Sequence, residues 1–314
     1  MEILEKIQKL KKELNAVILV HNYQLPEVQD IADFTGDSYG LSVQASKTQA
    51  DVIVFCGVYF MAETAKILSP QKTVVIPDPD AGCPMADMIT AEQLRELKRE
   101  HPRAKVMCYV NTSAEVKAEC DLCCTSANAV EILNNVFSPE DEILFVPDKY
   151  LATYAASQTG KKIIFWEGNC PTHLGGILPR DVLARKKEHP AAQVMVHPEC
   201  TPAVTQLADK VLSTSGMLKY ARESDAREFI IGTEIGILHA LKKENPGKNF
   251  YPVSNHMICP NMKKINLNKV LHSLETLSYE VKLPQEIITK AQKSLHNMLL
   301  AAKDPKAVAA ALVK

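Results

Sequence analysis

The sequence predicts an α/β protein of three homologous three-layer αβα units with small parallel sheets, arranged with pseudo-threefold symmetry about a central cavity. Three landmarks support this prediction, because each occurs three times at a nearly constant interval. A polar residue ends an apolar run, at intervals of 88 residues, at His21, Tyr109 and His197. A hydroxyl residue opens a helical pattern, again at intervals of 88, at Ser38, Ser126 and Thr214. A cysteine followed by proline recurs, at intervals of 87 and 89 residues, at Cys83, Cys170 and Cys259.

Within each unit, short apolar runs alternate with helical patterns in the order strand, helix, strand, helix, strand, helix, strand. Runs such as VIVFCG, EILFVP and EFIIG are apolar at successive positions, which is typical of parallel strands with helices on both faces. The repeating pattern covers residues 17–88, 105–177 and 193–265. We expect these three ranges to share one fold.

Two charged segments, residues 90–104 and 180–192, join the units, and each predicts a helix that ends before a His-Pro pair. The tail, residues 268–314, also has a helical pattern. The predicted division is therefore a first unit with an N-terminal helix at 1–104, a second at 105–192 and a third with a helical tail at 193–314.

Composition and charge exclude several classes of protein. Lysine and arginine number 36 against 37 acidic residues, so the net charge is −1 and no overall field attracts nucleic acid or anionic lipid. The apolar stretch at residues 52–62 is about half as long as a membrane-spanning helix. The N-terminal run MEILEKIQKLKKEL is a charged amphipathic pattern rather than a secretion signal. We expect a cytoplasmic protein that binds neither nucleic acid nor membranes.

The three Cys-Pro pairs predict a metal site. Nine cysteines in 314 residues are too few for a disulfide scaffold. Ligands of parallel sheets bind at the carboxyl ends of the strands, so equivalent cysteines of three units would meet at one cavity. Three thiolates fit a catalytic metal with an open position, or a 4Fe-4S cluster with one iron free to hold a substrate oxygen. The alternative is that each cysteine is an ordinary core residue, and the threefold repetition counts against it.

The other six cysteines are interpreted as structural. Cys120, Cys123 and Cys124 form C-x-x-C-C, which by itself is weak evidence for a zinc half-site or a redox pair. Three more lie in apolar runs or at strand ends, where core packing is the default, at Cys56, Cys108 and Cys200.

Polar residues of two kinds are expected around the same cavity. Ser38, Ser126 and Thr214, with Ser213 beside the last, lie where helices begin, so they are either N-caps or parts of anion sites. Asp37 and Glu234 are expected to accept hydrogen bonds or to cap helices. The candidate general acids, bases and oxygen-orienting groups are His21, Tyr23, Tyr109, Asn111, His173, His197 and Glu199.

Several runs, spread over nearly the whole chain, resemble the signature blocks of the quinolinate synthase family. They are VILVHNYQLPEVQDIADFTGDS, FCGVYFMAET, PDPDAGCPMADM, YVNTSAEVKAECDLCCTSANA, WEGNCPTH, VMVHPEC, STSGM, GTEIG and MICPNMK. The resemblance implies an oxygen-sensitive 4Fe-4S cluster held by Cys83, Cys170 and Cys259. It also implies condensation of iminoaspartate with dihydroxyacetone phosphate to quinolinate, with release of phosphate and water, in NAD biosynthesis.

The same resemblance implies roles for individual residues. Proton transfers would be catalysed by Tyr23, Tyr109, His197 and Glu199. Substrates would be bound by His21, Ser38, Tyr109, Asn111, Ser126, His173, His197, Glu199, Ser213 and Thr214. The unique iron would act as a Lewis acid. Some family members carry a C-x-x-C-x-x-C group near the C-terminus, and because this chain has no cysteine after Cys259, we expect no redox switching by that route.

Two alternatives stay open on the residues alone. The same features would serve a 4Fe-4S-dependent hydro-lyase that acts on a small hydroxy acid, or an iron-sulfur redox or sensor protein. For a quinolinate synthase, a further hypothesis is transient contact with the L-aspartate oxidase or aspartate dehydrogenase that supplies iminoaspartate.

Overall fold

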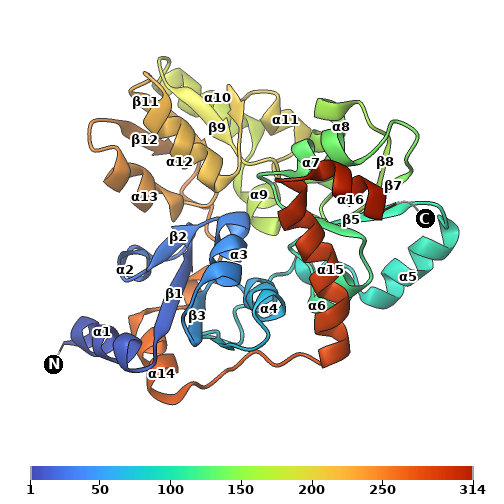
Figure 1. Ribbon diagram of the computed structural model, residues 1–314. Coiled ribbons are helices and arrows are strands. Elements are labelled where there is room, and N and C mark those ends of the chain that lie inside the picture. Colours follow the sequence, from blue (N-terminus) through green and yellow to red (C-terminus); the bar gives the residue numbers. More distant parts are fainter. Residues whose placement is uncertain (1, 313–314) are drawn as a thin grey trace.

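Three four-stranded parallel sheets, one from each third of the chain, form the framework of the molecule (Figure 1). The computed structural model describes residues 2–312. The three units are grouped around a common centre, with their helices outside and between the sheets. This arrangement confirms the predicted α/β fold of three equivalent units.

The first unit has the seven elements in the predicted order. They are β1 (Ala16–His21), α2 (Pro26–Asp30), β2 (Phe34–Gly36), α3 (Ser38–Lys47), β3 (Val52–Cys56), α4 (Tyr59–Leu68) and β4 (Thr73–Val75). Helix α1 (Ile3–Glu13) precedes them, and a 3-10 turn, η1 (Ala86–Met88), follows Cys83. Helix α5 (Ala91–Glu100) leads to the second unit, and it ends directly before the His101-Pro102 pair, as predicted.

The second unit repeats this succession. Its elements are β5 (Lys105–Tyr109), α6 (Ala114–Ala118), β6 (Leu122–Cys124), α7 (Ala129–Val136), β7 (Ile143–Val146), α8 (Lys149–Thr159) and β8 (Ile163–Phe165). Helix α9 (Pro171–Gly176) begins directly after Cys170. Helix α10 (Pro179–Glu188) leads to the third unit and ends at His189, before Pro190.

The third unit repeats it again. Its elements are β9 (Gln193–Val196), α11 (Pro202–Thr205), β10 (Lys210–Val211), α12 (Thr214–Glu223), β11 (Glu228–Gly232), α13 (Ile237–Glu244) and β12 (Asn249–Pro252). A 3-10 turn, η2 (Met262–Lys264), follows Cys259.

The strand order places the polar residues at the strand ends where a crevice forms. The orders are β2-β1-β3-β4, β6-β5-β7-β8 and β10-β9-β11-β12. In each sheet the second strand of the unit lies on one side of the first strand, and the third and fourth strands lie on the other side. Ligands of such sheets bind at this switch point, beyond the carboxyl ends of the strands. His21 ends β1, Tyr109 ends β5, and His197 directly follows β9. The three tips therefore occupy the same place in their units.

Apolar burial on both faces holds these tips rigidly. In β1, Val17, Ile18, Leu19 and Val20 are at most 7% exposed, so helices cover both sides of the strand. Each fully buried aliphatic side chain of this kind contributes about 1.5–3 kcal/mol. The corresponding strands β5 and β9 are buried in the same way.

The helical tail follows the third sheet in sequence but lies on the other two units (Figure 1). It consists of α14 (Leu267–Thr276), α15 (Gln285–Ala301) and α16 (Pro305–Ala311). Helix α14 packs on α1, α15 packs on α4, α6 and β6, and α16 packs on α7. The division at residues 104 and 192 stays a prediction. The tail follows the third unit in the chain but packs on the first and second.

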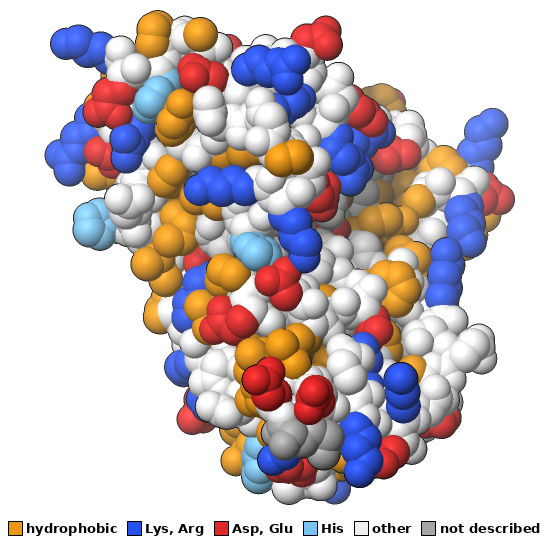
Figure 2. Space-filling view, turned by 90° about the vertical axis from the view of Figure 1, so that its left-hand side faces the viewer, with side chains coloured by type: hydrophobic (Ala, Val, Ile, Leu, Met, Phe, Trp, Pro, Cys, Tyr) orange, Lys and Arg blue, Asp and Glu red, His pale blue; other side chains and the backbone are white. Residues whose placement is uncertain are grey.

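The surface shown in Figure 2 carries charges of both signs, with lysine and arginine side chains interspersed among aspartate and glutamate. This pattern agrees with the net charge of −1. Among residues 2–312, no helix combines the length and the apolar character needed to cross a membrane.

Candidate active site

A cavity lies at the carboxyl ends of the three sheets, and residues from all three units line it. The predicted site residues that line it are His21, Tyr23, Ser38, Cys83, Tyr109, Asn111, Ser126, Cys170, His173, His197, Glu199, Thr214 and Cys259. Ser213 is not among the lining residues. Its hydroxyl accepts the backbone N–H of Gly216 at 3.2 Å, as the N-cap of α12, and donates to Asp37 at 3.3 Å. Every predicted site residue except Ser213 therefore meets at one cavity.

The three cavity cysteines differ from the other six thiols. Cys83, Cys170 and Cys259 are partly exposed, whereas the others are buried. Burial, with a smaller contribution from the nearby Cys259, raises the pKa of Cys83 to about 12. The pKa of Cys170 is also raised, first by burial and then by the charges of Glu199, Cys83 and Cys259. The three thiols are thus close enough to interact electrostatically, and a bound metal would have to displace their protons.

One group of side chains among residues 2–312 brings three candidate ligand atoms within 4.8 Å of one another: Cys170, His173 and Glu199. Cys83 and Cys259 line the same cavity, so the structure offers one thiol from each unit to a metal centre.

The C-x-x-C-C thiols are structural, as interpreted from the sequence. Cys123 Sγ lies 3.4 Å from Cys108 Sγ on the neighbouring strand and 3.3 Å from the Ser294 hydroxyl of α15. The Cys120 thiol donates to the Val116 carbonyl at 3.0 Å. All three are buried, and none lines the cavity.

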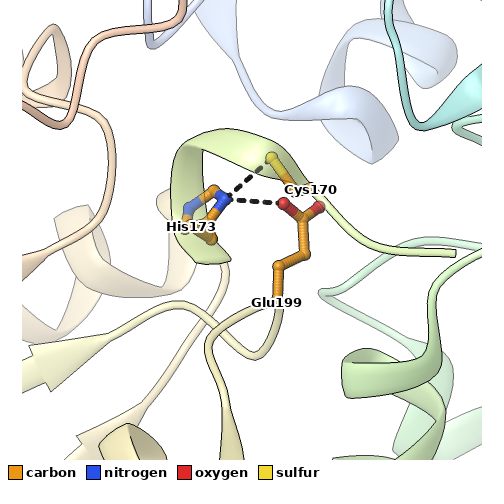
Figure 3. A group of neighbouring side chains, drawn as sticks. All are labelled: Cys170, His173 and Glu199. Carbon is orange, nitrogen blue, oxygen red and sulfur yellow. Dashed lines mark hydrogen bonds and ion pairs between the residues drawn. The ribbon is translucent and has the colours of Figure 1, made fainter. Parts of the chain in front are cut away.

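His173 contacts both a cavity cysteine and a buried carboxylate (Figure 3). Its Nδ1 lies 3.2 Å from Cys170 Sγ and 2.8 Å from Glu199 Oε2. Helix α9 begins at Pro171, because the fixed φ of proline suits the first helical position. The first turn of this helix places His173 beside the cysteine that precedes it.

A chain of hydrogen bonds extends from His173 and Glu199 to two tyrosines. His173 Nε2 lies 2.8 Å from Thr233 Oγ1, and that oxygen lies 2.5 Å from Tyr23 Oη. On the other side, the Tyr109 hydroxyl donates to Glu199 Oε1 at 2.6 Å. These five buried residues, which we call the acid–base chain, come from all three units. Protons can pass along such a chain between neighbouring groups.

The charge states along this chain follow from burial and contacts. Burial opposes ionisation of Glu199, yet the interactions with His197 and His173, together with the Tyr109 hydrogen bond, hold its pKa below the ordinary value. Burial, followed by the charge of Glu199, raises the pKa of Tyr23 and of Tyr109 well above the ordinary value. The site therefore pairs a carboxylate with two neutral phenols that can donate hydrogen bonds.

His21 and His197 are held in the same tautomer. The backbone N–H of Tyr23 donates to His21 Nδ1 at 3.1 Å, and that of Glu199 donates to His197 Nδ1 at 3.3 Å. Burial is the main cause that lowers their pKa values, to about 3 for His21 and about 4 for His197. Each neutral ring therefore carries its proton on Nε2, and His197 donates it to Ser126 Oγ at 3.1 Å.

Of the three hydroxyl residues expected at helix starts, Ser38 and Thr214 begin a helix at the cavity, whereas Ser126 does not. Helix α3 begins at Ser38 and α12 begins at Thr214, and both of these residues line the cavity. The Thr214 hydroxyl accepts from Asn22 Nδ2 at 2.8 Å, which leaves its proton free for a ligand. Helix α7 begins only at Ala129, so Ser126 lies in the turn before it. The Oδ1 of Asn111 is buried without a partner and is available to a bound group.

Sequence reasoning missed two residues of this site, Thr233 and Asn22. Both are fully buried, Thr233 in the acid–base chain and Asn22 against Thr214. Thr233 could have been predicted from the sequence, because it directly follows the strand EFIIG at the carboxyl edge of its sheet. Asn22 had no signal in its own segment, since its partner is 192 residues away.

Comparisons with known proteins agree with this geometry. The family described as "Quinolinate synthetase A protein" matches residues 5–300. The chain is 55% identical over 298 residues to "Quinolinate synthase 1" of Methanosarcina acetivorans, covering 95% of this chain and 97% of the relative. It is 56% identical over 297 residues to a quinolinate synthase of Dehalococcoides mccartyi, with 95% and 97% covered. It is 54% identical over 303 residues to one of Geobacter metallireducens, with 96% and 98% covered. The chain therefore belongs to the quinolinate synthase family.

Proposed function

We propose that this protein condenses iminoaspartate with dihydroxyacetone phosphate to form quinolinate, releasing phosphate and water, in NAD biosynthesis. The observation that supports the proposal most strongly is the meeting of three equivalent cysteines, one from each unit, with the acid–base chain in one cavity. The relatives named quinolinate synthase, which match over nearly their whole length, point to the same activity.

The residues present fit a 4Fe-4S cluster. Cys83, Cys170 and Cys259 would hold it, since they are the thiols that line the cavity and each unit contributes one of them. When bound, a cluster with one iron free of cysteine would supply a Lewis acid for a substrate oxygen.

Proton transfer would fall to the acid–base chain. As Tyr23 Oη takes up a proton from the substrate, it can pass its own proton to Thr233 Oγ1, and that hydroxyl can pass its own to His173 Nε2, so Tyr23 stays neutral while Glu199 stabilises the imidazolium that results. Tyr109 donates to the same carboxylate and keeps it oriented. This arrangement can remove a proton from a substrate carbon and return one to a leaving hydroxyl, as condensation and dehydration require.

Substrate anions would be held at the rim of the cavity. The N-termini of α3 and α12, with Ser38 and Thr214, offer backbone and hydroxyl donors to carboxylate or phosphate oxygens. Donors from the tips of the strands, His21 Nε2 and the Ser126–His197 pair, face the same space. Two carboxylates and one phosphate match these positions.

The test is anaerobic incubation of the reconstituted protein with oxaloacetate, ammonia and dihydroxyacetone phosphate, the first two forming iminoaspartate in solution. We expect quinolinate, detected by chromatography, and none from a Cys170→Ala control. If a hydroxy acid is dehydrated and quinolinate is absent, the protein is a hydro-lyase instead. If neither reaction occurs while the metal centre cycles reversibly, it is a redox or sensor protein.

The cytoplasmic location and the transient contact with an iminoaspartate-forming oxidase or dehydrogenase stay predictions from the sequence. A cytoplasmic location is the natural one for an enzyme whose substrates are small metabolites and whose thiols must stay reduced.

A further inference from the structure

An ion pair between buried Glu234, which lines the cavity, and partly buried Lys263 lies outside the acid–base chain. Glu234 follows β11 and is fully buried, and Lys263 belongs to the 3-10 turn η2. The ammonium Nζ lies 3.0 Å from Glu234 Oε1 and 3.2 Å from Oε2. A carboxylate this deeply buried needs a cation and hydrogen-bond donors, because desolvation of a lone charge is costly.

The carboxylate of this pair holds the backbone at a cavity cysteine. Glu234 Oε1 accepts the backbone N–H of Cys259 at 3.2 Å, and Oε2 accepts that of Gly236 at 2.7 Å. The position of Cys259 is therefore tied to the Glu234 side chain rather than only to its own loop.

The ammonium of the pair holds the backbone at Tyr23. Lys263 Nζ also donates a hydrogen bond to the Tyr23 carbonyl oxygen, which belongs to the first unit. The two units touch here, since a Cβ added at Gly236 would lie 2.6 Å from the same oxygen. Gln29 reinforces the contact by donating to the Gly236 carbonyl at 2.9 Å. One side chain thus connects the residue that begins the acid–base chain with the loop of the third cysteine.

We propose that Lys263 is a positioning residue that locks the Tyr23 loop of the first unit to the Cys259 loop of the third. Through Glu234 it fixes the third thiol, and through the Tyr23 carbonyl it fixes the phenol of the acid–base chain. The inference rests on the proposed function for its catalytic half, whereas its metal-binding half stands on the Cys259 contact alone. The other two cysteines have no equivalent lysine, because Asp87 and Leu174 occupy the position four residues after them.

The test compares Lys263→Met with Lys242→Met, which removes an exposed lysine from α13 in the same unit. Each reconstituted protein is mixed anaerobically with an iron chelator, and iron release is followed by absorbance. We expect Lys263→Met to lose iron about 10- to 100-fold faster than wild type, as when other supports of metal ligands are removed. Lys242→Met should release iron at the wild-type rate.

Steady-state kinetics give the second readout. Misplacing Tyr23 should lower kcat by about 100-fold and leave the KM for dihydroxyacetone phosphate nearly unchanged, because the anion-binding residues are intact. Equal iron release and equal kcat for Lys263→Met and wild type would overturn the inference. If wild type itself forms no quinolinate, the proposed function fails, and iron release still decides whether Lys263 positions the cysteine.

A second variant covers the case in which Lys263→Met does not fold. The double variant Glu234→Gln/Lys263→Met removes both charges of the pair, so no unpaired carboxylate is left buried. It should fold, as judged by circular dichroism, and still release iron faster than wild type. A folded double variant with wild-type iron release and kcat would contradict the positioning role.

Discussion

The loop that follows Cys170 differs from the loops that follow Cys83 and Cys259, although all three begin with the same Cys-Pro pair. After Cys170 a helix starts at once and places His173 against the sulfur and Glu199. After the other two cysteines a 3-10 turn starts three residues later. The buried residue Met85 directly precedes η1, and the buried residue Met262 is the first residue of η2. The repeated part of each loop places a thiol at the cavity, and the part that differs in the second unit places His173 beside Glu199, where we propose that protons are transferred.

The strand tips show the same division between shared and specialised residues. His21 and His197 keep one neutral tautomer through the same backbone contact, whereas the second unit has Tyr109 at this position and directs its hydroxyl to Glu199. Symmetry therefore explains where the side chains converge, and departures from symmetry distinguish the side chains that we propose to move protons.

The largest effect, loss of the metal centre, is expected from replacing the cysteine that all three units share. Cys83→Ala, Cys170→Ala and Cys259→Ala should each abolish stable iron binding, because every unit contributes one ligand. Cys120→Ala and Cys123→Ala, which remove buried thiols outside the cavity, should retain it. Iron and acid-labile sulfide per chain, measured after anaerobic reconstitution, check this. Full iron content in any of the first three variants would remove that cysteine from the centre.

The next largest effect, a loss of turnover, is expected from replacing Glu199, which contacts the His173 found only in the second unit. Glu199→Gln should leave the iron content unchanged and lower kcat by about 100- to 10,000-fold, because it removes the carboxylate that supports His173. Quinolinate formation and iron content measured on the same sample separate the two roles. Near-normal turnover would exclude Glu199 from proton transfer.

A smaller effect is expected from cutting the acid–base chain at the residue that sequence reasoning missed. Thr233→Val keeps the side-chain shape but removes the hydroxyl between Tyr23 and His173, and we expect kcat to fall by about 10- to 100-fold. Thr233→Ser, the matched control, keeps the hydroxyl and should keep most of the activity. Equal kcat for the two variants would show that protons do not pass through this residue.

The smallest effect, on stability alone, is expected from a hydrogen bond that joins the Cys83 and Cys170 loops outside the acid–base chain. The Trp166 indole N–H, just before Cys170, donates to the carbonyl of Met88, just after Cys83, at 2.8 Å. Trp166→Phe should lower the free energy of unfolding by about 1 kcal/mol, the usual net worth of one hydrogen bond, as measured by urea titration. An unchanged free energy of unfolding would mean that the two loops are held by other contacts.

The sequence predicted the order of elements in each unit and the convergence of the cysteines, because strand patterns, helix ends before proline and the 88-residue period are local or repeated signals. It did not predict contacts made when the units dock. The Asn22–Thr214 and Lys263–Tyr23 hydrogen bonds join residues 192 and 240 positions apart. The packing of α15 on the first and second units likewise depends on side-chain fit between distant segments.

The central claim, one metal centre shared by three units with an iron open to substrate, is tested most directly by Mössbauer spectroscopy of protein reconstituted with 57Fe. The account predicts a 4Fe-4S spectrum in which one iron changes when dihydroxyacetone phosphate or quinolinate is added, while the three cysteine-bound irons do not. A spectrum of four equivalent irons that is unaffected by either compound would contradict it.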